Sequence, residues 1–355
     1  MEQRLQQTVE KLPILSDCDS ERTEESCFMN KFYILYFVQD DKKPFFNSLI
    51  VQRKVSMGGH GISLVQRGLS ALSLWRDYRD SNLENVASQI RFHKKLTELI
   101  RTHVNQDPAK VKILEIGCGQ RASQTILLQA EGAHVIGIDR EVPTYHLSLK
   151  RFCRIIKING WERALKSLFR HFFFDHQFFR ELSRQFGKNL PPHQVNVCLM
   201  NAAHLSFSDD SFDFIFSSLV FEHIDDVAAA VGEVNRMLRP GGTARINIHL
   251  FPSLSGGHHK DWTDPRKWPS PKIPPWDHLR ENRYPVDNSL NKLRLGDYRR
   301  IFAESLEVME ESLVVEGEEI LTPQVETELV RRGYPKEDLL VREVAFRCRK
   351  RRARA

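Results

Sequence analysis

The sequence predicts an α/β fold in which a mostly parallel sheet carries helices on both faces. From residue 111 onward, short runs rich in β-branched and aromatic residues alternate with stretches of helical periodicity. Such alternation is typical of parallel sheets, because each crossover between parallel strands places a helix on one face. The chain has 355 residues, of which 41% are hydrophobic and 28% are charged, so it can bury a large core.

Seven segments carry the strand pattern, and a capped helix separates the fourth from the fifth. The expected strands are residues 111–117, 134–139, 195–200, 212–218, 243–250, 306–314 and 342–349. Asp225 or Asp226 is placed to cap a helix over residues 227–238, whose apolar side chains recur at helical spacing. The Pro-Gly-Gly sequence at 240–242 predicts the end of that helix.

Two long segments exceed what the sheet alone requires. Residues 141–194 contain two amphipathic helical patterns where a short crossover would suffice. Residues 251–294 form a loop rich in Pro, Trp and His that is too long to be a plain connector. The expected organisation is an N-terminal appendage at 1–56, a helical lead-in at 57–110, a domain at 111–350 and a basic tail at 351–355.

The charge distribution argues against a nucleic-acid-binding body. Residues 347–355 carry six basic residues and no acid, so the other residues hold 46 basic and 46 acidic groups, although the whole chain has a net charge of +6. This basic end is expected to be solvated. No stretch approaches the roughly 18 apolar residues that span a bilayer, and the N-terminus lacks the apolar run of a secretory signal. Six cysteines without a CxxC pair indicate reduced thiols, so we expect a cytoplasmic protein.

The most informative motif is LEIGCGQRA at 114–122, in which an apolar strand runs into two glycines and then a helix. Gly117 and Gly119 allow the backbone to approach a ligand closely, as in dinucleotide-binding proteins. Glu115 separates the possible ligands, because its carboxylate would repel a pyrophosphate but suits the cationic amino group of a methionine moiety. Asp139 ends the second strand, where a carboxylate can accept hydrogen bonds from ribose hydroxyls.

These residues resemble the class I S-adenosylmethionine-dependent methyltransferases, especially the bacterial branch that acts on sugars and other small molecules. The resemblance covers about residues 90–315 and implies a Rossmann-like seven-stranded sheet. It implies that Glu115 holds the amino end of S-adenosylmethionine and that Asp139 binds the ribose. The further cofactor residues that it implies are Gly117, Cys118, Gly119, Asn201, Ala202 and Ser217. Asn201 replaces the family's usual aspartate, yet its amide oxygen can still accept a hydrogen bond from the adenine amine.

The fourth strand runs into SSLVFEHIDDV, which resembles the family segment where cofactor and acceptor meet. Sugar methyltransferases similar to this chain use a histidine there as general base, which implies that role for His223. A histidine has a reference pKa near 6.5, which suits proton removal near neutral pH. His258 and His259 in the long loop are the alternative bases, and a His223 that only packs the helix start is a further alternative.

Both long segments are expected to lie near the acceptor. The loop follows the fifth strand, on the side where such sheets bind ligands, and Trp262, Trp268 and Trp276 offer flat faces for a ring-shaped acceptor. The alternative is a cover without acceptor contact. Residues 141–194 are expected to form a lid, with contact to a membrane surface or to a partner protein as alternatives.

We therefore expect transfer of a methyl group from S-adenosylmethionine to a hydroxyl of a small molecule or glycan precursor. An RNA methyltransferase and a non-catalytic S-adenosylmethionine-binding protein are the alternatives, and Glu115 opposes a nicotinamide-dependent oxidoreductase. No DNA partner and no metal site are predicted, because the loop histidines with Asp261, Asp264 and Asp277 lack the spacing of known metal motifs.

Overall fold

The computed structural model describes most of the domain and little of what precedes it. The described residues are 85–104, 107–144, 149–190, 195–265, 268–286 and 289–351. They all belong to one compact unit that begins at Ser73. The expected appendage at 1–56 lies outside the described residues, as does the first half of the lead-in.

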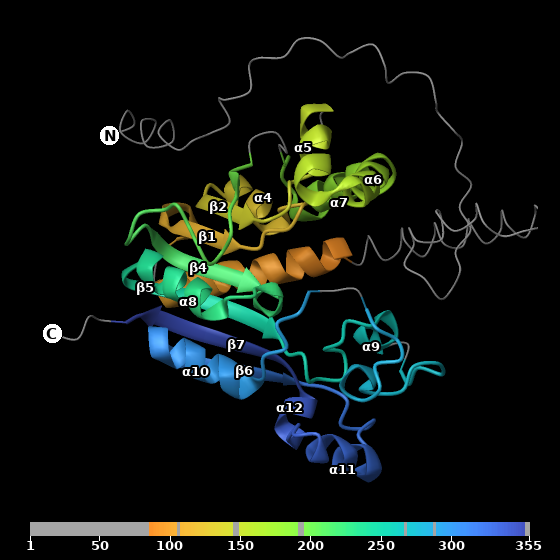
Figure 1. Ribbon diagram of the computed structural model, residues 1–355. Helices are drawn as coiled ribbons and strands as arrows, with labels where there is room; N and C mark the ends of the chain where they lie inside the picture. The colour runs from red at the N-terminus through yellow and green to blue at the C-terminus, as the bar shows by residue number, and fades with distance from the viewer. Residues whose placement is uncertain are drawn as a thin grey trace, which may run out of the picture. The chain divides into compact units, whose positions relative to one another are not determined.

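Within the described residues, seven strands form one sheet in the order β3-β2-β1-β4-β5-β7-β6 (Figure 1). The strands are β1 (Lys112–Ile116), β2 (His134–Asp139), β3 (Val197–Leu199), β4 (Phe212–Ser218), β5 (Leu238–His249), β6 (Leu306–Val315) and β7 (Val341–Lys350). Strands β1 to β5 pair in parallel, whereas β7 is antiparallel to both β5 and β6. The predicted Rossmann-like, mostly parallel seven-stranded sheet is confirmed.

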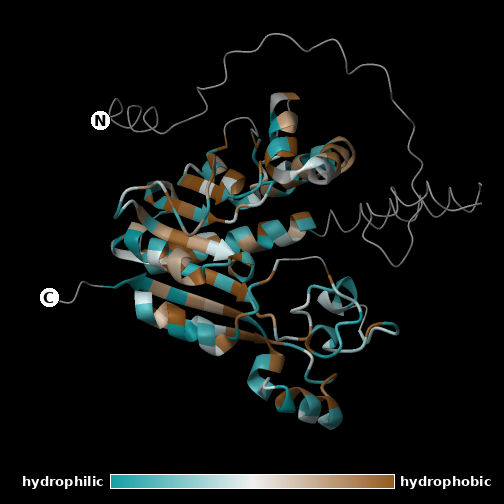
Figure 2. Ribbon diagram, viewed as in Figure 1, coloured by the Kyte–Doolittle hydropathy of each residue, from teal (hydrophilic) through white to brown (hydrophobic). Residues whose placement is uncertain are grey.

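Alternate residues of the central strands face opposite layers of helix. Ile113 and Phe214 pack with the helix at 85–104, while Leu114 and Ile215 pack with α8 and α10. The covering helices are α4 (Ser123–Ala130), α8 (Val227–Met237) and α10 (Leu295–Ser305). Figure 2 shows apolar residues concentrated in the strands and polar residues on the outer helix faces. Because both faces are covered, the strands read as continuous apolar runs, and the helix at 85–104 is part of the core.

Helix α8 begins as predicted and ends earlier than predicted. The Asp226 side chain accepts a hydrogen bond from the backbone N–H of Ala229 at 2.9 Å, which caps the first turn. The helix ends at Met237, and Leu238 already lies in β5. The Pro-Gly-Gly sequence at 240–242 therefore lies within the strand, and the expectation that it ends the helix is wrong.

The helical insertion is fastened to the segment that follows the two glycines of the motif. It consists of α5 (Leu149–Asn159), α6 (Trp161–Arg170), a π-helical turn (His171–Asp175) and α7 (His176–Phe186). The buried Asp175 carboxylate accepts hydrogen bonds from Arg121 at 2.8 Å and from Arg170 at 3.3 Å. Arg170 also donates to the Gln120 side chain at 2.8 Å. Polar contacts thus join the insertion to the start of α4.

The long loop packs into a small core of its own. This core combines Trp262 and Trp276 of the loop with Leu329 and Leu339 from two C-terminal helices. The short elements of this region are α9 (Lys260–Thr263), a 3-10 turn (Asp277–Leu279), α11 (Pro323–Arg331) and α12 (Lys336–Leu340). Trp262 and Trp276 are only 3% and 0% exposed, so the expectation that they offer faces to an acceptor is wrong. Their apolar area stabilises the loop instead.

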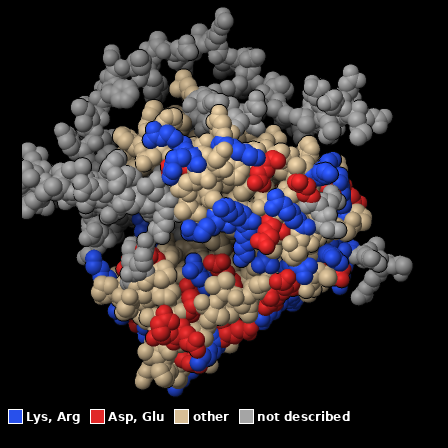
Figure 3. All heavy atoms as spheres, turned by 180° about the vertical axis from the view of Figure 1, so that it is seen from behind, with Lys and Arg blue, Asp and Glu red and all other residues tan. Residues whose placement is uncertain are grey.

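The basic C-terminal run is largely a strand. Residues 347–350 lie in β7, where Arg347 donates to Glu310 at 2.9 Å and Lys350 pairs with Asp210. The expectation of a solvated end is wrong for this part. Figure 3 shows basic and acidic side chains intermixed over the visible face of the described chain, which agrees with a charge-balanced body.

The buried Asp175 carboxylate yields a prediction about stability. We expect Asp175→Ala to lower the free energy of unfolding by about 2 to 4 kcal/mol, because two arginines then lose the carboxylate that they share. The loss stays below that of a fully buried pair because the Arg121 and Arg170 side chains are 16% and 23% exposed. Urea unfolding measures the change. As a control, Asp209→Ala removes a carboxylate that is 71% exposed, and it should cost less than about 1 kcal/mol. Equal losses in the two variants would contradict a stabilising role for Asp175.

Candidate functional site

The predicted cofactor residues meet at one edge of the sheet. Parallel strands have their carboxyl ends at the same edge, and the strand order places β3, β2, β1 and β4 side by side. Along this edge, Asn201 follows β3, Asp139 ends β2, Gly117 follows β1 and Val220 follows β4. Residues that are far apart in the sequence therefore lie at the same edge of the sheet.

Glu115 lies on β1, and its carboxylate is buried. It accepts a hydrogen bond from the Thr125 hydroxyl at 2.5 Å. Burial raises the pKa of Glu115 to about 7, against the opposing effect of the Thr125 hydrogen bonds. Gly137 pairs with Glu115 across the two strands, and a Cβ atom at Gly137 would lie 2.5 Å from the Thr125 hydroxyl oxygen. The sequence analysis missed Thr125 and Gly137, although a glycine inside a strand is itself a signal of close approach.

Gly117 and Gly119 have the backbone geometry that the motif predicted. Their φ angles are +78° and +68°, which are strained for other residues. A Cβ atom at Gly117 would lie 2.3 Å from a methyl carbon of Val220, whereas one at Gly119 would meet open space. The loop therefore presses against the end of β4 on one side and is open on the other.

Asp139 connects the end of β2 to the glycine loop. Its carboxylate oxygens accept hydrogen bonds from the backbone N–H groups of Gly119 and Glu141, each at 2.8 Å. Burial raises the pKa of Asp139, and these hydrogen bonds oppose the effect. The carboxylate thus lies beside the open side of the loop, as a ribose-binding role requires.

The other predicted cofactor residues differ in what they can offer. Asn201 is exposed, and its side-chain oxygen accepts from the Ala203 N–H at 3.2 Å. Ala202 and Cys118 are buried among apolar side chains. The Ser217 hydroxyl donates to the Ile116 carbonyl at 2.9 Å and is buried. Ser217 therefore joins β4 to β1, and only Asn201 of this group presents an exposed polar side chain.

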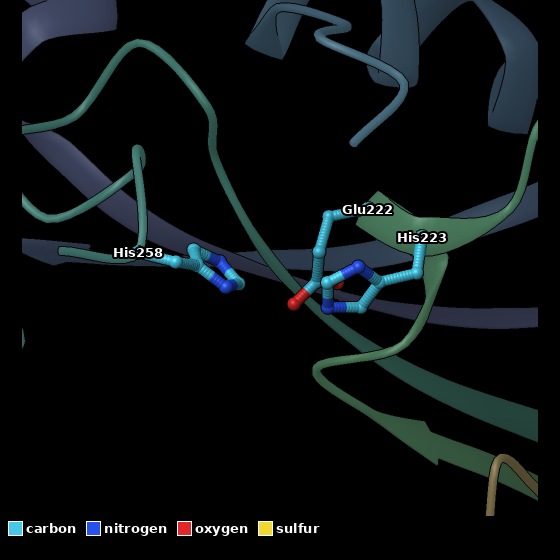
Figure 4. A group of neighbouring side chains, drawn as sticks. All are labelled: Glu222, His223 and His258. Carbon is cyan, nitrogen blue, oxygen red and sulfur yellow. The ribbon is translucent and has the colours of Figure 1, made fainter. Parts of the chain in front are cut away.

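A second group of side chains gathers where β4 ends. A 3-10 turn (Phe221–His223) follows the strand, and ligand atoms of Glu222, His223 and His258 all lie within 4.8 Å of one another. Figure 4 shows the Glu222 carboxylate between the two imidazole rings. We call these three residues the Glu-His-His cluster. The structure brings together two of the three histidines that the sequence analysis singled out.

The histidines of the cluster are held in defined orientations. The Nδ1 atom of His223 lies 2.7 Å from the Ser289 carbonyl oxygen, which can only accept, so Nδ1 carries the proton. His258 has a φ angle of +57° and stacks on His249 with ring centroids 4.9 Å apart. Burial lowers the pKa of His258 to about 4, and His223 adds to the effect. His258 is therefore neutral near physiological pH.

His259 does not join the cluster. Its Nδ1 atom accepts a hydrogen bond from the Asp261 N–H at 3.2 Å and caps α9. It lines a small cavity of ≈ 120 Å³ with Trp262 and Asp277. The role of alternative base that the sequence analysis gave to His259 has no support in this position.

Glu222 and Asn291 are functional candidates that the sequence analysis did not select. Glu222 is 2% exposed, and neither of its carboxylate oxygens has a hydrogen-bond partner among the described residues. Burial raises its pKa to about 8. Asn291 donates to the carbonyl oxygens of Phe221 and Ile224 at 2.7 and 2.9 Å, and it thereby fixes the turn that carries the cluster. The Glu-His sequence signalled Glu222, but no local pattern could signal Asn291.

Comparison with known proteins agrees with this geometry. A family profile described as a methyltransferase domain matches residues 114–246, which run from Glu115's strand into β5. An O-methyltransferase, rstn1, from Aspergillus nomiae is 24% identical over 182 residues, which are 51% of this chain and 63% of that protein. A demethylmenaquinone methyltransferase from Staphylococcus haemolyticus is 35% identical over 66 residues, or 18% of this chain and 28% of that protein. The chain thus spans less than two thirds of the length of either relative.

A solved structure completes the comparison. An S-adenosylmethionine-dependent methyltransferase from Mesorhizobium loti is 17% identical, with a TM-score of 0.36, over 67% of this chain and 90% of that one. The matched domain begins on β1 and includes both glycines and Asp139. It also includes Glu222 and His223 and ends within β5. The family match thus identifies a methyltransferase domain at residues 114–246 of this chain.

Proposed function

We propose that this protein transfers a methyl group from S-adenosylmethionine to a hydroxyl of a small molecule or glycan precursor. The proposal rests on the closeness of the glycine loop to the Glu-His-His cluster. Gly117 of the glycine loop packs against Val220, and Glu222 and His223 follow Val220 by two and three residues. The sulfonium methyl group of a cofactor bound on this loop would therefore lie beside the polar side chains that we expect to contact the acceptor.

Methyl transfer from a sulfonium requires few catalytic groups from the protein. The methyl group of a sulfonium is already activated, so the protein must align the acceptor oxygen with it and remove the hydroxyl proton. In this proposal Glu115 holds the ammonium of the cofactor and Asp139 holds its ribose. His223 and His258 supply imidazole rings at the acceptor end, and we propose that deprotonation of the acceptor depends on His223.

Two further features support a small hydroxylated acceptor. The relative from Aspergillus nomiae is named an O-methyltransferase. In Figure 3, acidic side chains lie among the basic ones on the visible face of the described chain, an arrangement that does not favour RNA as the acceptor. Among the described residues, no helix is long and apolar enough to cross a membrane.

We propose that α5 to α7 serve as a lid, because Arg121 and Arg170 tie them to the glycine loop through Asp175.

The buried Glu115 predicts a pH dependence of cofactor binding. Below pH 7 the ligand-free protein holds Glu115 protonated, because its pKa is raised to about 7. A cationic ammonium favours the ionised form, so binding releases a proton, and affinity rises about tenfold per unit as the pH increases towards 7. Calorimetry with S-adenosylhomocysteine in two buffers of different ionisation enthalpy measures both effects. The control Glu115→Gln should flatten the profile, and a wild-type affinity that does not change with pH would contradict the role.

The ribose contact predicts a loss of affinity in Asp139→Ala. We expect binding of S-adenosylmethionine or S-adenosylhomocysteine to weaken by about 1 to 3 kcal/mol, since hydrogen bonds to a charged carboxylate are lost. Asp139→Asn should lose less, because its amide oxygen can still accept from Gly119. Calorimetry on variants with unchanged circular dichroism gives the result. Binding of a nicotinamide dinucleotide in place of these ligands would overturn the cofactor assignment.

The acceptor side predicts a loss of turnover with intact cofactor binding. His223→Ala should lower turnover by about 10²- to 10⁴-fold, the range for a group that assists proton removal. Its affinity for the cofactor should stay within about twofold of wild type, because cofactor contacts lie on other residues. A radiolabelled methyl-transfer assay over hydroxylated small molecules provides the measurement. His259→Ala is the matched control and should retain turnover, so the opposite ranking of these variants would place the acceptor site elsewhere.

A further inference from the structure

The Glu-His-His cluster has the donor set of a metal site. One carboxylate oxygen and two imidazole nitrogens lie within 4.8 Å of one another. Ligand atoms at about 2.0 to 2.2 Å from a shared ion lie about 3 to 4.4 Å apart, so the three atoms need to approach one another by about 2 Å at most to complete the geometry. No sequence motif signalled this group, because its third member lies 35 residues beyond His223 and meets it only in the fold.

His223 is prepared as a metal ligand by its other ring nitrogen. Histidines that bind metals usually donate the second N–H to a carbonyl or carboxylate, which fixes both tautomer and ring orientation. The Nδ1 atom of His223 makes this bond to the Ser289 carbonyl at 2.7 Å. The lone pair on Nε2 therefore faces the cluster, and Asn291 fixes the backbone turn from which it projects.

Glu222 is the buried carboxylate of the cluster. The Glu222 residue is 2% exposed, its carboxylate points between the two rings, and neither carboxylate oxygen makes a hydrogen bond of normal geometry among the described residues (Figure 4). No ion pair of Glu222 occurs in the described chain either. An ionised carboxylate in such a place costs several kcal/mol unless a cation compensates it. The arrangement fits a ligand that carries positive charge.

His258 is held in place at a conformational cost. Its φ angle of +57° is unfavourable for a residue with a side chain, and it directly follows two glycines of the loop. Backbone strain of this kind persists where the surrounding structure enforces it, and it is concentrated at functional sites. His249 stacks on the far side of the ring and keeps it facing His223.

We infer that Glu222, His223 and His258 bind one divalent first-row transition metal ion, such as Zn²⁺, Mn²⁺ or Fe²⁺. Two histidines and one carboxylate leave coordination positions open for a further oxygen ligand. The inference rests on the proposed function, since that oxygen would be the acceptor hydroxyl. The ion would lower the pKa of this hydroxyl, whose proton leaves to water. The oxygen then forms a bond to the methyl carbon as the carbon–sulfur bond breaks, and the electron pair stays on sulfur in S-adenosylhomocysteine.

Metal binding can be tested without any enzyme assay. The full-length protein is dialysed against a chelator and titrated with Co²⁺, whose visible absorption reports nitrogen and oxygen ligands, and with Zn²⁺ in a calorimeter. We expect one ion per chain, and a loss of affinity of at least about 100-fold in both Glu222→Gln and His258→Ala. His259→Ala is the matched control, because His259 is adjacent in sequence and outside the cluster. Binding of equal strength in all four proteins would overturn the inference.

The activity arm separates this inference from the proposed function. Chelator-treated protein should lose methyl transfer while it keeps its affinity for S-adenosylhomocysteine, and Zn²⁺ or Mn²⁺ should restore turnover. Full turnover after chelation, with no metal found by elemental analysis, would overturn the metal site and leave the methyltransferase intact. Stoichiometric metal binding lost in Glu222→Gln, without methylation of any hydroxylated acceptor, would support the metal site and contradict the proposed function.

Discussion

Five parallel strands end at one edge of the sheet, and this constraint places every polar group of the candidate site. Strand β1 delivers Glu115 and the glycine loop, β2 delivers Asp139, and β4 delivers Glu222 and His223. The loop after β5 returns His258 to the same edge. Because ladder hydrogen bonds fix the strands relative to one another, the positions of these side chains are set by the fold before any ligand arrives.

The buried carboxyl group of Glu115 destabilises the ligand-free protein at neutral pH. Burial raises the pKa of Glu115 to about 7, whereas an unfolded glutamate ionises near pH 4.3. Its contribution to stability is therefore lost as the pH rises from the unfolded value to about 7, and it does not return above that. The ammonium group of a bound cofactor would offset the cost of ionising the buried Glu115. The apolar clusters on both faces of the sheet offset it in the free protein, and Thr125 offsets part of it directly.

Local sequence was enough for elements whose signal is local. All seven strands, the capped start of α8 and the two glycines were predicted, because strand pattern, capping and φ preference act over a few residues. The site was predicted only in part. Asn291 acts on carbonyl groups 67 and 70 residues away, and Glu222 became distinctive only through burial without a partner. The exposure of Trp262 and Trp276 was wrongly predicted, because they pack against Leu329 and Leu339, which lie more than 50 residues later in the sequence.

We propose that cofactor and acceptor meet between the glycine loop and the Glu-His-His cluster. A crystal structure of the full-length protein with S-adenosylhomocysteine tests it most directly. We expect the amino group beside Glu115, the ribose hydroxyls on Asp139, and the sulfur directed at the cluster. The space between sulfur and cluster should fit a methyl group and one acceptor oxygen, with reacting atoms about 3 to 3.5 Å apart. A ligand bound away from this edge, or a sulfur that points away from His223 and His258, would contradict this arrangement.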